Sequence, residues 1–326
     1  MADFETRYRE YRRKVEGYLR TMVRKPLPAT LYDPMRFVLN GGGKRVRSVL
    51  VLVACRAVGG RIETALPASA AIEILHNFTL VHDDIMDNAS TRRGRPTVHT
   101  SWDENVALLS GDAMVALAYE ALLRSPRRSA HELSTLFSEG LLVVCEGQAL
   151  DKEFETSRSV TLRQYLGMIE KKTARMISVA AELGAILGGA SPRQRSALRT
   201  YGSLLGRAFQ IQDDLLDITG NEQSFGKRIG GDLREGKKTY ILLRALERAR
   251  GKDKRELMRV FRKERIAWGE ISAFRQICQR TGALDDARRK IGRDIGAAQA
   301  QLVRLPRTTD RDMLFWFSEL LRERST

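Results

Sequence analysis

Apolar residues recur along this 326-residue chain at helical spacing, not in strand-like alternation. Within the segment 68–87 they occupy Ile72, Ile74, Leu75, Phe78, Leu80, Val81, Ile85 and Met86. This spacing favours an α-helix. The segments 162–187 and 196–218 are long, largely apolar and rich in Ala and Leu. We therefore expect two further helices there, each buried on most of its sides.

Eight prolines divide the chain, and the intervals between Pro126, Pro192 and Pro306 leave room for long helices. Ser191 and Pro192 are suited to be the cap and the first-turn residue of the helix that follows them. Other helices are expected over 103–123, 130–150, 238–250, 254–262, 270–280, 284–303 and 310–322. No Asn-Gly or Asp-Gly turn lies between alternating segments, so strand signals are nearly absent. The pattern predicts an all-α fold.

The chain shows no repeat at a fixed period and no low-complexity linker. Its length is ample for a substantial core and could hold one large domain or two ordinary ones. We interpret residues 1–326 as a single domain. The part beyond about residue 250 is more polar, and we expect its helices, over 250–326, to be peripheral.

Hydrophobic residues make up 43% and charged residues 29% of the chain, a balance typical of globular proteins. The formal net charge of +16 raises the question of a nucleic-acid partner. However, basic residues are interleaved with acidic ones, and no zinc-finger spacing or RNA-binding aromatic motif occurs. We therefore expect no nucleic acid. A solvated basic surface, attraction to anionic substrates and peripheral contact with an acidic membrane remain as explanations.

The N-terminus is charged and lacks an apolar signal core, so we do not expect export. Apolar runs are short, as where Arg56 ends the run 49–55, and we expect no membrane-spanning segment. Cys55, Cys145 and Cys278 are far apart and fit no metal spacing. Buried, reduced thiols in a cytoplasmic protein are the expected interpretation.

Two aspartate clusters share one spacing: Asp83, Asp84 and Asp87 in LVHDDIMD, and Asp213, Asp214 and Asp217 in FQIQDDLLD. On a helix this spacing places carboxylates on one face within a turn, where like charges destabilise each other. Both clusters have apolar neighbours, and burying an unpaired charge is costly. One such cluster could be an exposed acidic turn. Two of them indicate sites for Mg²⁺, which takes one or two carboxylates together with water and phosphate oxygens.

A glycine turn at positions 41–43 precedes Lys44, Arg45 and Arg47, of which two or three are expected to serve as cations at a helix start. Backbone amides at such a turn, followed by a helix start, are suited to binding an anion. The turn is not a Walker loop, because the spacing GxxxxGK[ST] is missing and no strand precedes it. Taken alone, it could be a loop before an ordinary helix.

Further cations accompany both aspartate clusters. Arg92 and Arg93 follow the first cluster and can bind phosphate oxygens in a planar fork. Lys172, Lys227 and Lys237 precede or follow the second cluster. Each lysine alone could be an ordinary surface residue. Together with the carboxylates, these cations describe a site for two diphosphate-bearing molecules, where metal and arginine neutralise a departing diphosphate.

No Ser/His/Asp triad and no Cys–His pair is a candidate for nucleophilic catalysis. Of the four histidines, His76 and His82 have suggestive positions near the first aspartate cluster.

The chain resembles the trans-isoprenyl diphosphate synthases, the polyprenyl synthetase family. The resemblance covers roughly residues 35–245 and is carried by GGGKRVR, HNFTLVHDDIMDNASTRRG, GDAMVALA, EGQALD, KKTA, GRAFQIQDDLLDITG and GKRIGGDLREGKKTY. It implies an all-helical fold around a deep central cavity, of the isoprenoid synthase type, and a homodimer. It also implies head-to-tail (1′-4) condensation of an allylic diphosphate with isopentenyl diphosphate.

Matching motifs carry the family's residue roles onto this chain. About three Mg²⁺ ions, which Mn²⁺ is expected to replace, would be bound by Asp83, Asp84, Asp87, Asp213, Asp214 and Asp217. The allylic diphosphate would be bound by Arg92, Lys172, Lys227 and Lys237. Isopentenyl diphosphate would be bound by Lys44, Arg47, His76 and Arg93. Thr173 and Gln210 would lie near the reacting carbons. The released pyrophosphate would take the proton, so the reaction would need no protein base.

Residues upstream of the first cluster set product length in this family. Phe78 lies five residues before Asp83 and Thr79 four, and Asp84 and Asp87 have no insertion between them. One aromatic residue beside a smaller one resembles archaeal geranylgeranyl-forming enzymes, in which a ring blocks the tunnel that holds the growing chain. We expect a C20 product ahead of C15, with longer products behind. Phe78 could also be ordinary core packing.

Three other functions are alternatives. A terpene cyclase of the same architecture usually carries Asn, Ser and Glu in its second metal motif. The second cluster of this chain consists of aspartates only. A non-catalytic subunit of a heteromeric synthase typically loses one cluster, and both are intact here. A basic nucleic-acid binder with coincidental motifs would show salt-sensitive binding without turnover.

Overall fold

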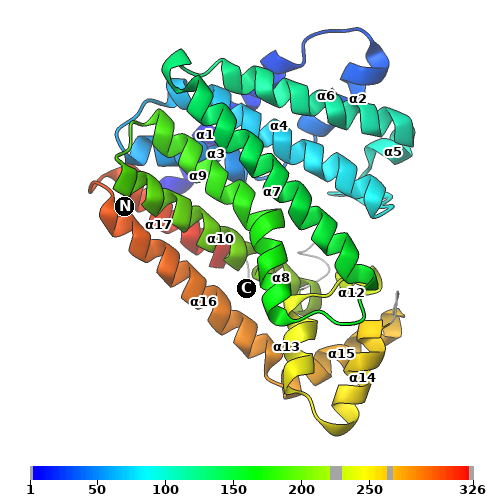
Figure 1. The fold of residues 1–326 in the computed structure, drawn as a ribbon. Coiled ribbons are helices and arrows are strands. Elements are labelled where there is room, and N and C mark those ends of the chain that lie inside the picture. Colours follow the sequence, from blue (N-terminus) through cyan, green and yellow to red (C-terminus); the bar gives the residue numbers. More distant parts are fainter. Residues whose placement is uncertain (1–2, 221–229, 263–266, 323–326) are drawn as a thin grey trace. The chain divides into compact units, whose positions relative to one another are not determined.

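The computed structural model describes residues 3–220, 230–262 and 267–322, and almost every element among them is a helix, as predicted (Figure 1). Two compact units are present. Unit 1 comprises Met1–Glu139, Met176–Arg199 and Gln301–Trp316, and unit 2 comprises Gly140–Arg175, Thr200–Ala300 and Phe317–Thr326. That residues 1–326 form one domain stays a prediction.

Unit 1 contains the N-terminal half of the helices. Its elements are α1 (Phe4–Met22), α2 (Ala29–Leu39), α3 (Val46–Ala57), α4 (Ile62–Met86), β1 (Thr91–Arg92), β2 (Arg95–Pro96), α5 (Val98–Ser101), α6 (Glu104–Leu123) and η1 (Arg127–Ser129). It also holds parts of α7 (Ala130–Thr156), α9 (Arg175–Leu187), α10 (Pro192–Thr219) and α17 (Thr309–Arg322), and η3 (Leu302–Arg304). Helix α4 packs against both α3 and α6 (Figure 1).

Local sequence explains where these helices begin. The side chain of Asp3 accepts a hydrogen bond from the backbone of Thr6 and caps α1. Asp103 does the same for α6 through the backbone N–H of Val106, at 2.8 Å. The cap predicted at Ser191 is also present. Its Oγ accepts from the backbone N–H of Gln194 at 3.4 Å, and its own backbone N–H donates to Gln194 Oε1 at 2.8 Å at the start of α10.

The sequence led us to expect no membrane span, yet α6 is long and apolar enough to cross a membrane by length and composition. Of the 18-residue apolar stretch that meets this criterion, 44% is buried. The helix packs against α2 and α4 inside unit 1. The charges of Asp112 and Glu120 lie within it. The core helix of a folded domain meets the same criterion, so the length of α6 by itself does not indicate a membrane.

A short hairpin interrupts the helices of unit 1, and the sequence signals missed it. Strands β1 and β2 pair antiparallel, with Arg92 opposite Arg95. The two turn residues, Arg93 and Gly94, have φ values of 54° and 72°. Positive φ at both positions is the geometry of a two-residue hairpin turn, which usually selects Asn-Gly or Asp-Gly. Strands of two residues are also too short for alternation to be seen.

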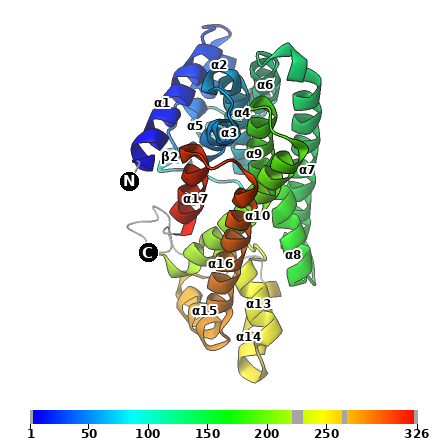
Figure 2. The ribbon, with the colours of Figure 1, turned by 90° about the vertical axis from the view of Figure 1, so that its left-hand side faces the viewer.

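Unit 2 contains the remaining helices. They are most of α7 and α10, α8 (Leu162–Ile169), the π-helix η2 (Glu170–Ala174), α12 (Gly231–Arg234), α13 (Tyr240–Arg248), α14 (Gly251–Arg262), α15 (Trp268–Arg280) and α16 (Ala283–Gln301). Helix α13 packs against α14 and α15 (Figure 2). Thr161 and Gln164 form a capping box at the start of α8.

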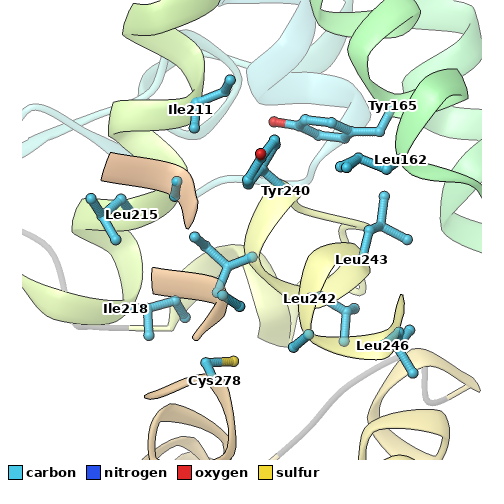
Figure 3. Packing of buried hydrophobic residues seen from close by; sticks show 14 of the residues in the cluster. Leu162, Tyr165, Ile211, Leu215, Ile218, Tyr240, Leu242, Leu243, Leu246 and Cys278 are labelled. Atoms are coloured by element: carbon cyan, nitrogen blue, oxygen red, sulfur yellow. The ribbon is translucent and has the colours of Figure 1, made fainter. Parts of the chain in front are cut away.

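The core of unit 2 gathers apolar side chains from α8, α10, α13 and α15, and Figure 3 shows them packed together. Ile211 and Leu215 come from α10, and Leu242 from α13. The rings of Tyr165 and Tyr240 meet edge-to-face in this core, with centroids 6.4 Å apart. This core holds α10, the helix that carries the second aspartate cluster.

The predicted helix over 162–187 is present but interrupted, because η2 separates α8 from α9. Periodicity did not predict this break, since a π-turn adds a residue without changing which residue types are used. The predicted helices over 130–150 and 196–218 extend further, to Thr156 and from Pro192 to Thr219.

One expectation about the cysteines is wrong. Cys55 and Cys278 are buried, and burial raises the pKa of the Cys55 thiol to about 12. Cys145 is exposed on α7. The residue before it, Val144, is buried, so the thiol lies on the outward face of a helix that also contributes to the core.

Candidate active site

The first aspartate cluster lies at the C-terminal end of α4. Asp83 and Asp84 are in its last turn and Asp87 is its C-cap residue. Asp84 is buried, and its Oδ1 accepts a hydrogen bond from Arg92 Nε at 2.6 Å. Burial raises the pKa of Asp84, and Arg92 opposes this shift. Arg92, predicted to bind diphosphate, therefore lies directly beside a predicted metal ligand.

The predicted glycine turn lies in the same unit. Gly42 and Gly43 have φ values of 76° and 117°, which side chains rarely adopt. Arg93 Nη1 donates a hydrogen bond to the carbonyl of Gly42 at 2.9 Å. Lys44 is exposed at the end of the turn. The hairpin and the glycine turn thus bring Arg93 and Lys44, both predicted to bind isopentenyl diphosphate, to neighbouring backbone segments.

Arg45 has a structural role that the sequence did not reveal. Its Nη1 donates to Glu73 Oε1 at 2.9 Å, and Ser48 Oγ donates to Glu73 Oε2 at 2.8 Å. Arg45 and Glu73 are only 4% and 2% exposed. The pair ties the start of α3 to the middle of α4, so removing either partner would leave a buried charge without its counterion.

Arg47 and His76, both predicted to bind isopentenyl diphosphate, are in contact. Arg47 Nη1 lies 3.2 Å from His76 Nε2. A guanidinium has no acceptor, so His76 Nε2 accepts the hydrogen bond and the imidazole is neutral. Burial lowers the pKa of His76 well below its usual range, and the nearby charges of Arg47, Arg93 and Arg92 lower it further. These arginines therefore gather near one imidazole and form an anion-attracting surface.

The two residues predicted to set product length lie on α4, upstream of Asp83. The Phe78 ring meets the His82 ring edge-to-face, with centroids 4.7 Å apart. A Cβ added at Gly111 of α6 would lie 2.1 Å from His82 Nε2, so only glycine leaves room for this imidazole. Thr79 Oγ1 donates to the carbonyl of His76 at 2.8 Å. Phe78 thus rests on a side chain that α6 supports.

The second aspartate cluster lies at the C-terminal end of α10, beside a pocket of unit 2. The pocket is lined by Asp151, Tyr165, Lys172, Gln210, Asp214, Asp232, Lys237 and Lys238, among others. It therefore contains both acidic and basic side chains from five segments of the chain. Asp213 is half-buried and does not line it.

Asp214 is the most enclosed carboxylate of this pocket. It accepts hydrogen bonds from Tyr165 Oη at 2.5 Å and from the backbone of Tyr240 at 2.8 Å. Burial and the charge of Asp232 together raise the pKa of Asp214 to about 7, although these hydrogen bonds lower it. Such a carboxylate gains most from a neighbouring cation, because a positive charge favours its ionised form.

Asp217 also accepts backbone hydrogen bonds, from Gly231 at 3.1 Å and Asp232 at 3.3 Å at the start of α12. Burial and the charge of Asp232 raise the pKa of Asp217 to about 8. Its carboxylate oxygens are therefore partly occupied by helix α12. Asp232 itself was missed in the sequence, although it follows the second cluster in the quoted motif GKRIGGDLREGKKTY.

The remaining predicted residues of unit 2 are also brought together. Lys172 Nζ donates to Asp151 Oδ2 at 2.5 Å, and Lys237 Nζ lies 2.7 Å from Glu235 Oε2. Thr173 Oγ1 donates to Gln210 Oε1 at 2.8 Å. Lys227 lies outside the described residues. Asp151 and Tyr165 were not predicted, because their roles depend on partners far away in the sequence.

Both clusters suit a divalent cation. Each lies at a helix C-terminus, where the helix dipole disfavours negative charge and a bound cation would offset that cost. Carboxylate oxygens are the ligands that Mg²⁺ prefers. Over residues 3–220, 230–262 and 267–322, no three His, Cys, Asp or Glu side chains converge on one ion position. This agrees with Mg²⁺, which takes one or two carboxylates and completes its coordination with water and phosphate oxygens.

A family model described as polyprenyl synthetase matches residues 28–277. The short chain isoprenyl diphosphate synthase of Methanothermobacter thermautotrophicus is 37% identical over 319 residues, which are 97% of each chain. The geranylgeranyl diphosphate synthase of Methanosarcina mazei is 44% identical over 223 residues, which are 68% of this chain and 69% of that relative.

The crystal structure of geranylgeranyl pyrophosphate synthetase from Pyrococcus horikoshii matches this fold with a TM-score of 0.93, at 35% identity and 98% coverage of both chains. Two other relatives are named as synthases of longer products. They are a geranylfarnesyl diphosphate synthase of Natronomonas pharaonis, 37% identical over 91% of each chain, and an all-trans-nonaprenyl-diphosphate synthase of Rhodobacter capsulatus, 36% identical over 91% of this chain and 90% of the relative. The all-α fold and the resemblance are thereby confirmed, and the chain belongs to the polyprenyl synthetase family of prenyltransferases.

Proposed function

We propose that this chain is a magnesium-dependent prenyl diphosphate synthase that joins isopentenyl diphosphate head-to-tail (1′-4) to an allylic diphosphate. One observation carries the proposal: within each unit, an aspartate cluster lies beside cations. Asp84 pairs with Arg92 in unit 1, and Asp214 shares a pocket with Lys172 and Lys237 in unit 2. Each grouping places carboxylates suited to a metal ion next to cations suited to phosphate oxygens.

The residues divide by substrate. Arg92, Lys172 and Lys237 bind the allylic diphosphate, and Lys227 is assigned with them from its motif. Lys44, Arg47, His76 and Arg93 bind isopentenyl diphosphate, which the contact of neutral His76 with Arg47 supports. The allylic C–O bond breaks, its carbon bonds to isopentenyl diphosphate, and the proton leaves with pyrophosphate. Cations around the departing diphosphate stabilise its growing charge.

Asp83, Asp84, Asp87, Asp213, Asp214 and Asp217 would hold about three Mg²⁺ ions, for which Mn²⁺ is expected to substitute. When bound, these ions supply Lewis-acid stabilisation of the leaving diphosphate. Asp232, which lines the pocket beside Asp214, extends this set. Thr173 and Gln210 are polar neighbours of Asp214, because Thr173 donates to Gln210 and Gln210 Nε2 donates to Asp214 Oδ1 at 3.2 Å.

For the product we propose C20, ahead of C15. The half-buried Phe78 ring on α4, supported by His82, suits a floor for the growing chain. The relatives named as geranylgeranyl diphosphate synthases favour the same length, whereas those named for longer products make a longer chain the alternative. A homodimer and a cytoplasmic location accompany this proposal, and peripheral membrane contact is a further one suggested by the net charge of +16.

The test is direct. Purified protein is incubated with Mg²⁺, isopentenyl diphosphate and dimethylallyl, geranyl or farnesyl diphosphate in turn, and products are separated by chain length. We expect extension of at least one primer to a C20 product. Failure to extend any of the three primers would refute the synthase assignment.

A further inference from the structure

The π-helix η2 carries Lys172 and Thr173. A π-helix closes its hydrogen bonds over five residues, so η2 presents its side chains in directions that the flanking α-helices do not set. π-Helices are rare and occur mostly as single turns inside α-helices, frequently at functional sites. The positions of Lys172 and Thr173 therefore depend on the side chains that pack against η2.

Two glycines bring neighbouring helices unusually close to η2. A Cβ added at Gly147 of α7 would lie 2.3 Å from the backbone N of Lys172. A Cβ added at Gly206 of α10 would lie 2.5 Å from the Cα of Ala174. Real Cβ atoms do not approach other atoms so closely, so both helices contact the backbone of η2 only because they have glycine there. These contacts hold the backbone of η2 against α7 and α10.

Arg207, the residue after Gly206, binds the first residue of η2. Its Nη1 donates to Glu170 Oε1 at 2.7 Å. On its other edge, Nε and Nη2 donate to the two carboxylate oxygens of Asp294 on α16, each at 2.7 Å. Asp294 is 3% exposed and also accepts from Lys290 Nζ at 2.8 Å. This two-point contact fixes the plane of the guanidinium.

The opposite end of η2 is held from the same helix. Gln210 lies three residues after Arg207 on α10 and accepts the hydrogen bond of Thr173 Oγ1. Two side chains on one face of α10, Arg207 and Gln210, therefore hydrogen-bond to η2 at Glu170 and Thr173. Lys172 lies between these two points. Lys172 then reaches Asp151 in the pocket.

We propose that Arg207, oriented by Asp294, is a positioning residue that fixes η2 through Glu170 and so places Lys172 and Thr173 in the pocket. The inference rests on the proposed function, in which those two residues serve the allylic substrate. Arg207 is not among the residues that line the pocket, and it acts through Glu170. A lysine at this position could reach Glu170 or Asp294 but could not reproduce the fork.

The test compares Arg207→Met and Arg207→Lys with Arg248→Met. Arg248 is the matched control, because its Nη2 pairs with Asp286 of α16 at 2.6 Å and it does not line the pocket. We expect kcat to fall on the order of 10²-fold in Arg207→Met, since small misplacement of a reacting group has effects of that size. The kcat of Arg207→Lys should lie between those of the wild type and Arg207→Met. Arg248→Met should keep the wild-type kcat.

The KM for isopentenyl diphosphate should stay at the wild-type value in all three variants, because its assigned residues belong to unit 1. A purely structural role would instead lower kcat equally in Arg207→Met and Arg248→Met, in step with thermal stability. Equal losses would overturn the positioning role.

The rate of hydrogen exchange of the backbone amides in 170–174 reports how firmly Arg207 holds η2, and it does not depend on turnover. We expect faster exchange in Arg207→Met than in Arg248→Met. Equal exchange in the two variants would overturn the inference even if the protein folds poorly. If the wild-type protein extends no primer, the proposed function is refuted. Faster exchange in Arg207→Met than in Arg248→Met would still support the positioning of η2 by Arg207.

Discussion

Arg45 and Arg47 stand two residues apart, yet their guanidiniums have different partners. Arg45 is buried against Glu73, whereas Arg47 contacts His76. The sequence predicted both arginines as cations of one anion-binding turn. It could not separate them, because the partner Glu73 lies on another helix and its burial depends on tertiary packing. A single residue's charge is readable from sequence, whereas the group that neutralises it is not.

Phe78 allows a prediction at the scale of one side chain. Phe78→Ala should shift products toward chains longer by one or more isoprene units, because it removes the ring proposed as the floor of the product site. Products from wild type and variant are separated by chain length under identical conditions. Since Phe78 is half-buried, its loss should cost less than the roughly 3–5 kcal/mol typical of a fully buried Phe→Ala change.

Phe37→Ala is the matched control for that experiment. Phe37 is another half-buried ring of unit 1 with one edge-to-face partner, Trp102, at 5.3 Å between centroids. Its removal should leave the product distribution unchanged. If Phe78→Ala also leaves the distribution unchanged, the ring does not set product length.

Two helical glycines, one packed against η2 and one facing open space, should change the midpoint of thermal unfolding in opposite directions when replaced by alanine. Gly206→Ala should lower the midpoint of thermal unfolding, because overpacking typically costs about 1–3 kcal/mol. Gly292→Ala on α16 has nothing within 4 Å of its new Cβ. It should raise the midpoint, since alanine is favoured over glycine in a helix by about 1 kcal/mol. A stabilising Gly206→Ala would show that α10 does not press on η2.

Helices were the most predictable elements, and their interruptions the least. The spacing of apolar residues and the proline positions were enough to predict α6, α10 and most others. The π-helix η2 was not predicted, because its residues remain good helix formers. The turn at Arg93 and Gly94 was not predicted either. Its positive φ at Arg93 accompanies a hydrogen bond to Gly42, about fifty residues away, which no local pattern contains.

For the whole molecule, the family was predictable because its motifs are local strings, each readable without a structure. Most candidate site residues were found in the same way. Asp232 and Tyr165 were missed, because they join Asp214 only through folding. The net charge of +16 suits attraction of diphosphates, although composition alone did not assign it to a site.

Both aspartate clusters are proposed to serve one magnesium-dependent condensation. The most direct measurement is the rate of product formation against Mg²⁺ concentration, for wild type, Asp84→Asn, Asp214→Asn and the control Asp253→Asn. Asp253 pairs with Arg280 at a distance of 2.8 Å, outside the residues that line the pocket. We predict no product in EDTA, losses of at least about 10²-fold in each cluster variant, and a normal rate for the control. Wild-type rates in either cluster variant, or condensation in EDTA, would contradict the account.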